Sequence, residues 1–206
     1  MKKSRISEVL SGLIDLIVAG LLWILCSLPI LTIGASSTAL YYAVVKCVRH
    51  NRGRLTPTFF SGFRSNFRQA TLTWLLFLAY ALIGLADAFA IGKMGFGPGS
   101  ILYHFSRLFF LPLLIFFPWV FAFISRFQNT VSGTLKYCGW LALRYPGKTL
   151  VLVLELAGFL LISWMLPPLI PILPGIFCLL MSVTIEQVFK ALHSDDNSAQ
   201  DPWYNE

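Results

Sequence analysis

The stretch from Ser27 to Arg49, SLPILTIGASSTALYYAVVKCVR, constrains the fold most, because it is an apolar run that opens beside a proline and closes on positive charge. Pro29 lacks a backbone N–H and disfavours a helical conformation at Leu28, so one helix ends here and another begins. The apolar runs on either side, residues 10–28 and 29–48, each have about the twenty residues that cross a bilayer core of about 30 Å. We therefore predict a membrane hairpin at the start of the chain.

The composition extends this prediction to the whole protein. The chain has 206 residues, of which 57% are hydrophobic and only 12% charged, whereas about a quarter are charged in soluble domains. Further apolar runs cover residues 70–91, 107–124, 150–166 and 170–190. We predict an all-α, polytopic membrane helical bundle with six transmembrane helices, forming a single transmembrane domain over residues 1–190, and a short acidic tail over residues 191–206. The alternative has five transmembrane helices, with residues 34–48 re-entrant.

The basic residues give the orientation of this bundle. Three precede the first span, six lie between Lys46 and Arg68, and four lie between Arg126 and Lys148. The loops expected on the opposite side offer Lys93 and, at a span end, Arg107. Because lysine and arginine accumulate in cytoplasmic loops, both termini are predicted to be cytoplasmic. The first apolar run contains Asp15 and leads directly into the next one, which favours a retained helix over a cleaved signal peptide.

Two basic segments have the pattern of helices that lie in the membrane interface. After Thr56 and Pro57, the residues Phe60, Phe63 and Phe67 recur at helical spacing, with Arg64 and Arg68 elsewhere around the turn. The rings would enter the headgroup region while the arginines bind anionic lipids or a partner. The second segment follows Val131. A nucleic-acid surface would need an exposed soluble platform, so we expect no nucleic-acid partner.

Small residues mark the expected contacts between helices. Ala35, Ala39 and Ala43 fall on one helix face, and Gly84 and Ala88 form a similar face in the third span. Such faces allow close helix packing in membranes. The hydroxyls at Ser36, Ser37 and Thr38 are open to a second interpretation, a polar substrate path.

Ionisable residues inside the spans are the places where chemistry is expected. Folding the third and fourth spans about Gly97 brings Asp87 level with Arg107, which predicts an ion pair. Folding the last two spans about Ile170 brings Glu155 level with Glu186, and Asp15 lies at a similar depth on the first span. These three acids form a candidate intramembrane acidic site, or are neutralised near the cytoplasmic boundary by Lys190, Lys46 or the loop arginines.

The sequence gives no sign of an enzyme. His50, His104 and His193 show no paired ligand spacing, the four cysteines are scattered, and hydrolase or metalloprotease motifs are missing. We therefore expect no catalytic residues, no metal and no cofactor. Cys47 and Cys138 face a reducing compartment in the predicted topology, so free thiols are expected rather than disulfides.

Several segments resemble one family along nearly the whole chain. They are WILCSLPILTIGASSTALYYAVVK, FRSNFRQA, SRFQNTVSGTLKYCGWLALRYPGKTL, IEQVFK and DPWYNE. These segments are similar to the YesL family of bacterial integral membrane proteins. The resemblance implies a location in the bacterial cytoplasmic (inner) membrane and a role linked to carbohydrate uptake, and it supplies no active-site residues.

Two functional classes follow. The first is a non-catalytic accessory protein of carbohydrate uptake, with the lipid bilayer, anionic lipids and carbohydrate permease subunits as partners. The second is a small solute transporter with a cytoplasm-facing acidic site. The chain has no evident inverted repeat and no pair of polar residues in broken helices at the midplane, features of many secondary carriers, so the first class is favoured.

Overall fold

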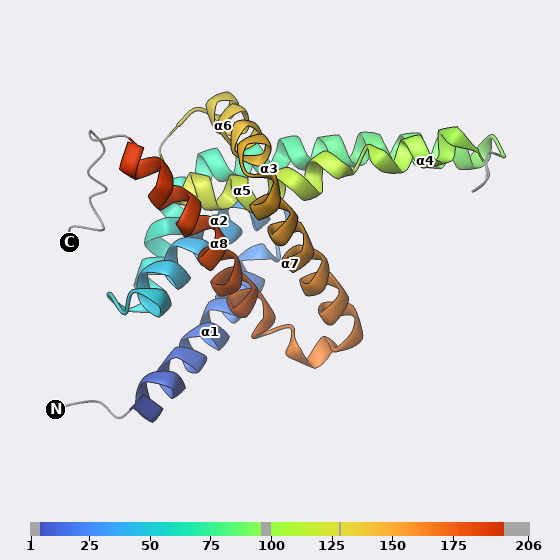
Figure 1. The fold of residues 1–206 in the computed structure, drawn as a ribbon. Coiled ribbons are helices and arrows are strands. Elements are labelled where there is room, and N and C mark those ends of the chain that lie inside the picture. The colour runs from blue at the N-terminus through green and yellow to red at the C-terminus, as the bar shows by residue number, and fades with distance from the viewer. Residues whose placement is uncertain (1–4, 96–99, 128, 196–206) are drawn as a thin grey trace.

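The computed structural model describes residues 5–95, 100–127 and 129–195, and over these ranges it contains helices and no strand. The all-α prediction is therefore confirmed. The elements are α1 (Arg5–Ser27), η1 (Ile30–Thr32), α2 (Ile33–Ala43), η2 (Val44–Arg49), α3 (Leu55–Lys93), α4 (Ile101–Leu108), α5 (Leu111–Arg126), α6 (Val131–Arg144), α7 (Pro146–Met165), η3 (Pro167–Leu169) and α8 (Leu173–Asp195). Figure 1 shows a bundle with a long two-helix arm that projects from it.

The break at Pro29 is stabilised by the next hydroxyl along the chain. α1 ends at Ser27, and the Thr32 hydroxyl lies 2.6 Å from the carbonyl oxygen of Cys26 and 2.7 Å from that of Pro29. The last carbonyls of a helix have no partner within it, so a hydroxyl placed here satisfies one that would otherwise face lipid. The predicted boundary between the first two spans, at Pro29, therefore coincides with the break between α1 and η1.

α2 is the central helix of the bundle. It contacts α1, α3, α5 and α8, and Ala35, Ala39 and Ala43 have no exposed surface. The helix continues through η2, a short π-helix that ends at Arg49. Residues 34–48, for which a re-entrant loop was the alternative, are therefore continuously helical and mostly buried.

Close approaches of backbones hold α2 and α8 in place. A Cβ atom built on Gly34 would lie 2.5 Å from the carbonyl oxygen of Ala70 in α3. A Cβ atom on Gly175 of α8 would lie 2.6 Å from the carbonyl oxygen of Leu16 in α1. Only glycine fits at such contacts, which is how membrane helices come close enough for strong packing.

α3 differs from the prediction in its length. The basic segment after Pro57 is helical, but it forms the first third of one 39-residue helix rather than a separate interfacial helix. The reason is local: no proline or other break separates Phe67 from the apolar run that begins at Ala70. The second predicted interfacial helix is a separate element, α6.

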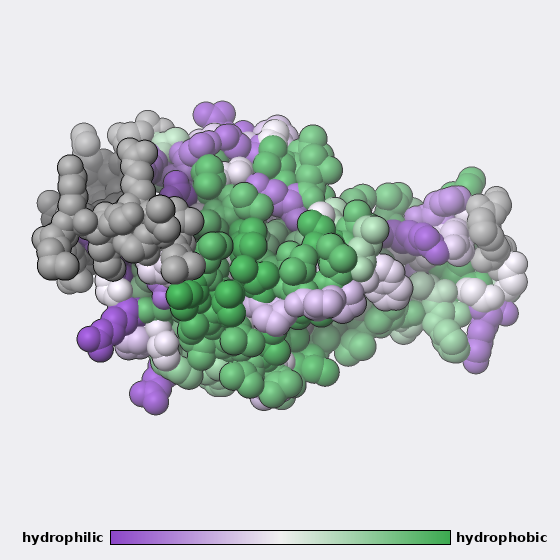
Figure 2. Space-filling model, turned by 90° about the horizontal axis from the view of Figure 1, so that it is seen from below, coloured by the Kyte–Doolittle hydropathy of each residue, from purple (hydrophilic) through white to green (hydrophobic). Residues whose placement is uncertain are grey.

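The outer part of α3 pairs with α4 to form the arm, defined here as residues 82–93 and α4. Its side chains are largely apolar and exposed. The exposed fraction is 62% for Ile83, 65% for Phe89 and 73% for Phe105. Figure 2 shows hydrophobic surface across the middle of one face, continuing along the arm. Such a surface is expected where the surrounding solvent is lipid.

A second helix break separates α4 from α5. Pro112 lies in the first turn of α5, and the helix is interrupted at Phe109 and Phe110. The Tyr80 hydroxyl donates to the carbonyl oxygen of Phe109 over 2.9 Å, and the two rings stack at 4.2 Å. A neighbouring helix thus supplies the hydrogen bond to a carbonyl at the break, as a kinked membrane helix requires.

Within the described residues, five helical segments are long and apolar enough to cross a membrane: Ile30–Arg49, Leu55–Lys93, Ile101–Arg126, Pro146–Met165 and Leu173–Ala191. A shorter apolar helix covers Ser11–Ser27. The six predicted spans fall within these six segments, apart from a few residues at their ends. The protein is therefore a helical membrane protein. The tail beyond residue 195 lies outside the described residues.

The packing at Gly34 can be tested by substitution. Gly34→Ala would place a methyl group against the Ala70 carbonyl, so we expect it to lower the thermal unfolding midpoint in detergent, at a cost of about 1–3 kcal/mol. Gly158→Ala is the matched control, because a Cβ atom there meets nothing within 4 Å. In a helix interior that change is expected to be neutral or slightly stabilising. Equal effects of the two substitutions would contradict the close contact.

Candidate functional site

A buried ion pair joins α5 to α8. Arg126, in the last turn of α5, donates from Nη2 to Oε1 of Glu186, and the two side chains are only 2% and 1% exposed. The hydroxyl of Tyr41 in α2 lies 3.2 Å from the same carboxylate oxygen and donates to it. A charge taken out of water is costly unless it is paired and hydrogen-bonded, so these partners keep the Glu186 carboxylate in the core.

A second arginine reaches α8 one turn earlier. Arg49, the last residue of η2, donates from Nη1 to the carbonyl oxygen of Ser182, and its Nη1 also lies 3.2 Å from the Ser182 hydroxyl. The charges of Glu186, Arg49 and Arg126 act on the neighbouring residue, His50. Burial lowers the pKa of His50; Glu186 opposes this effect, and the two arginines add to it. The imidazole is therefore mostly neutral at pH 7.

The predicted union of Glu155 with Glu186 does not occur. Lys148 of α7 donates to the side chain of Gln187 over 2.6 Å, and Phe159 stacks on Phe177 at 4.7 Å. This register places Glu155 about six residues, or about 9 Å, away from Glu186 along α8. The prediction was wrong because the turn between α7 and α8 is centred two to three residues before Ile170, which shifts every pairing.

The other two acids of the predicted site have different surroundings from Glu186. Glu155 is half-buried, and its Oε2 atom has no hydrogen-bond partner among the described residues. Asp15 is also half-buried and lies near Cys47 of η2, close enough for an electrostatic effect. The alternative interpretation, neutralisation by a loop arginine, is the one that the structure gives for Glu186.

The predicted ion pair between Asp87 and Arg107 is also missing from the described parts of the arm. Arg107 instead donates to the hydroxyl of Tyr103, one turn earlier in α4, and lies over its ring at 4.4 Å. Asp87 is exposed. Gly84 packs on Phe109 and Phe110 across the hairpin. Asp87 and Arg107 therefore lie at similar heights, as predicted, but the side chain of Arg107 contacts Tyr103 of its own helix instead of Asp87.

The basic part of α3 has a mixed character. Arg64 and Arg68 are exposed, and Phe60 and Phe67 are each 41% exposed. Phe63 is half-buried and stacks on Phe59, which is fully buried. The structure therefore leaves the two arginines and two of the three predicted rings available for lipid or partner contact. Of the predicted packing residues in the third span, Gly84 is buried and Ala88 half-buried.

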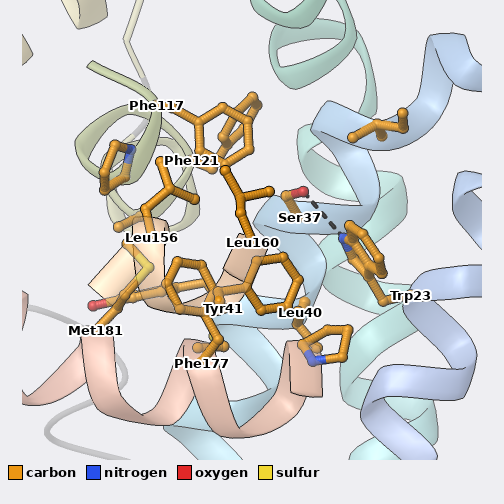
Figure 3. A pocket seen from close by; sticks show the side chains of 16 residues that line it. Trp23, Ser37, Leu40, Tyr41, Phe117, Phe121, Leu156, Leu160, Phe177 and Met181 are labelled. Atoms are coloured by element: carbon orange, nitrogen blue, oxygen red, sulfur yellow. Dashed lines mark hydrogen bonds between the residues drawn. The ribbon is translucent and has the colours of Figure 1, made fainter. Parts of the chain in front are cut away.

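An apolar cavity of about 230 Å³ lies next to the ion pair. It is lined by residues of α1, α2, α5, α7 and α8, and Figure 3 shows Tyr41, Phe177 and Leu160 around it. Its hydroxyl groups are already engaged: Ser37 accepts from Trp23 Nε1 over 3.1 Å, and Tyr41 bonds to Glu186. Sugar hydroxyls would lose their hydrogen bonds to water here, so the cavity suits an apolar occupant.

Tyr41 connects the cavity to the ion pair, since its ring lines the cavity and its hydroxyl contacts Glu186. Sequence reasoning missed Tyr41 and Ser182, and it included Arg49 and Arg126 only among the loop arginines. The available signal was weak, because an arginine at the end of a span is normally explained by the membrane interface.

The cysteines are free in the structure, as expected. Cys138, on α6 outside the apolar segments, is fully buried, and burial raises its pKa to about 12. A thiol with such a pKa is inert at neutral pH. No group of three or more histidine, cysteine, aspartate or glutamate residues within the described ranges could hold a metal ion.

The ion pair can be tested through stability. Glu186→Leu leaves Arg126 buried without its carboxylate, so we expect a loss of about 3–5 kcal/mol in the free energy of unfolding. The double change Arg126→Leu with Glu186→Leu removes both charges and is expected to lose less than Glu186→Leu alone. Thermal unfolding in detergent measures both. A double variant less stable than both single variants, with the losses simply added, would contradict the pairing.

Residues 16–88 match the model of a protein family described as "Protein of unknown function, DUF624". The matched segment runs from the middle of α1 to the outer part of α3, so it includes the hairpin at Pro29 and the central helix α2. No curated protein and no solved structure matches the chain.

Proposed function

We propose that the chain is a non-catalytic accessory protein of a carbohydrate uptake system in the bacterial cytoplasmic membrane, with both termini in the cytoplasm. The carbohydrate link rests on the resemblance to the YesL family, whose segments extend well beyond the DUF624 match at residues 16–88. In this role the protein binds a permease and does not itself carry the sugar.

The character of the cavity is the main support for an accessory role. A sugar site needs several free donors and acceptors beside aromatic rings. The cavity has the rings, but its two hydroxyl groups are bonded to Trp23 and Glu186. The cavity therefore does not suit a sugar, and we assign sugar handling to the partner.

The state of Glu186 gives further support. A proton-coupled carrier needs a carboxylate that changes protonation during transport. Glu186 is bound by Arg126 and Tyr41 from two other helices, so a change in its charge would disturb the core of the bundle. Its role is therefore structural.

The exposed parts of α3 offer two kinds of contact. The arm presents apolar side chains that are exposed in the described part of the chain, and Arg64 and Arg68 present charge at the opposite end of α3. The apolar part suits the bilayer or a transmembrane partner, and the arginines suit an acidic partner surface or lipid.

A small transporter is the second candidate, and Glu155 is the observation that favours it. Its Oε2 atom is buried without a hydrogen-bond partner among the described residues, as expected for a carboxylate that binds a proton or a substrate. This makes Glu155 the residue that separates the two functions.

Co-purification tests the accessory role. The tagged full chain, extracted from native membranes in mild detergent, is expected to retain permease subunits, and Glu155→Gln should retain them equally. Arg64→Gln with Arg68→Gln should weaken the association, by about thirtyfold at about 1 kcal/mol per charge. Arg54→Gln with Arg144→Gln removes the same charge elsewhere on the exposed surface and is the control.

A growth assay on the sugar of the uptake system can contradict the accessory role. If Glu155→Gln abolishes growth while the variant lacking Arg64 and Arg68 grows normally, the accessory role is wrong and the transporter is supported. Glu186→Gln is unsuitable for this comparison, because it is expected to damage the fold.

The orientation is tested with impermeant thiol reagents on intact cells. Gly53 and Gly95 have positive φ values of 83° and 80°, so a cysteine is better placed at the neighbouring exposed residues Arg54 and Met94. Met94→Cys should react from outside, and Arg54→Cys only after permeabilisation. Labelling of Arg54→Cys in intact cells would reverse the proposed orientation.

A further inference from the structure

A groove on the bundle surface, separate from the cavity beside Tyr41, runs between α3 and α5. Its walls are apolar, with Leu76, Phe77 and Tyr80 on α3 and Pro112, Leu113 and Phe116 on α5, and it measures about 530 Å³. α6 crosses one end, where Leu135 and the exposed Lys136 complete the lining. The groove is thus apolar along its length and positively charged at one end.

The charged end lies where α3 changes from basic to apolar. Gln69 of α3 donates to the Thr134 hydroxyl of α6 over 3.0 Å, which fixes α6 at the height where the apolar run begins. Leu76 and Tyr80 lie about 10 and 17 Å further along α3, in the apolar part. The polarity of the groove therefore follows the polarity of the bilayer, from the headgroup boundary into the hydrocarbon core.

Two further features suit a lipid headgroup at this end. Arg68, Leu72 and Leu76 share one face of α3, and all three are exposed, so a second cation lies on the face that leads into the groove. On its other side, Lys136 borders a second hollow with Tyr137 and Trp140, which are 55% and 50% exposed. Tyrosine and tryptophan prefer the headgroup level of a membrane.

We infer that this groove is a binding site for one anionic phospholipid, with the phosphate at Lys136 and an acyl chain between α3 and α5. The inference rests on the match of charge and depth, and it is independent of the proposed partnership with a permease. A zwitterionic lipid such as phosphatidylcholine would fill the apolar walls, but its choline group would offset the charge of the phosphate that Lys136 binds. An acidic peptide would satisfy Lys136 but would not suit the apolar groove.

The test uses the purified full chain, without any partner protein, titrated in detergent and observed by native mass spectrometry. Phosphatidylglycerol and phosphatidylcholine with the same acyl chains are compared. We expect one saturable phosphatidylglycerol molecule per chain, bound about fivefold more tightly than phosphatidylcholine, as one cation near a membrane surface provides. Equal affinities for the two lipids would overturn the proposal.

Matched variants locate the headgroup. Lys136→Gln should reduce the affinity for phosphatidylglycerol about fivefold, and Lys136→Arg should retain it. Arg144→Gln, on the same helix and outside the groove, removes the same charge and should bind like the wild type. If Lys136→Gln and Arg144→Gln behave alike, the phosphate is not bound at Lys136 and the site is wrong.

A second pair of variants tests the acyl chain. Leu76→Trp narrows the groove and should weaken both lipids, whereas Leu75→Trp, on a neighbouring residue that does not line the groove, should not. Glycerol phosphate without acyl chains should compete poorly. Full competition by glycerol phosphate, or equal effects of the two tryptophans, would contradict binding along the groove. Thermal unfolding midpoints confirm that each variant is folded, so a loss of binding reports the site itself.

Discussion

The buried pair of Arg126 and Glu186 is the interaction on which the bundle depends. Each charge alone would be very costly in the buried core, and together with Tyr41 the pair ties three helices from distant parts of the sequence. A second arginine holds α8 at nearly the same level, because Arg49 donates to Ser182 one turn earlier on the same helix. Inside a membrane the hydrophobic effect gives helices little drive to associate, so a paired charge adds specificity beyond that of close packing.

Packing supplies the remaining stability through small residues rather than through large ones. Gly34 allows α2 to touch the backbone of α3, and Gly175 allows α8 to touch α1. The alanines of α2 are fully buried for the same reason. These contacts leave the larger rings to surround the cavity beside Tyr41, where the packing is incomplete.

The helical segments were largely predictable, because a run of apolar residues and a proline are local signals. Pro29 and the alanine spacing of α2 are visible in one stretch of sequence, and both match the structure. The pairing of acids was not predictable in the same way. It depends on where the chain turns between α7 and α8. The prediction placed this turn two or three residues too late, and therefore put Glu155 level with Glu186, from which the structure separates it. The partner of Glu186 lies 60 residues earlier, at a distance that no local pattern encodes.

The length of α3 has a mechanical consequence. At 1.5 Å per residue its 39 residues extend about 58 Å, nearly twice the thickness of a bilayer core, with no proline after the first turn. Such a helix behaves as a rigid lever. A rotation of 10° about its basic end would displace the tip by about 10 Å. A tilt of α3 at its basic end, where Arg64 and Arg68 lie, would therefore be amplified at the tip of the arm.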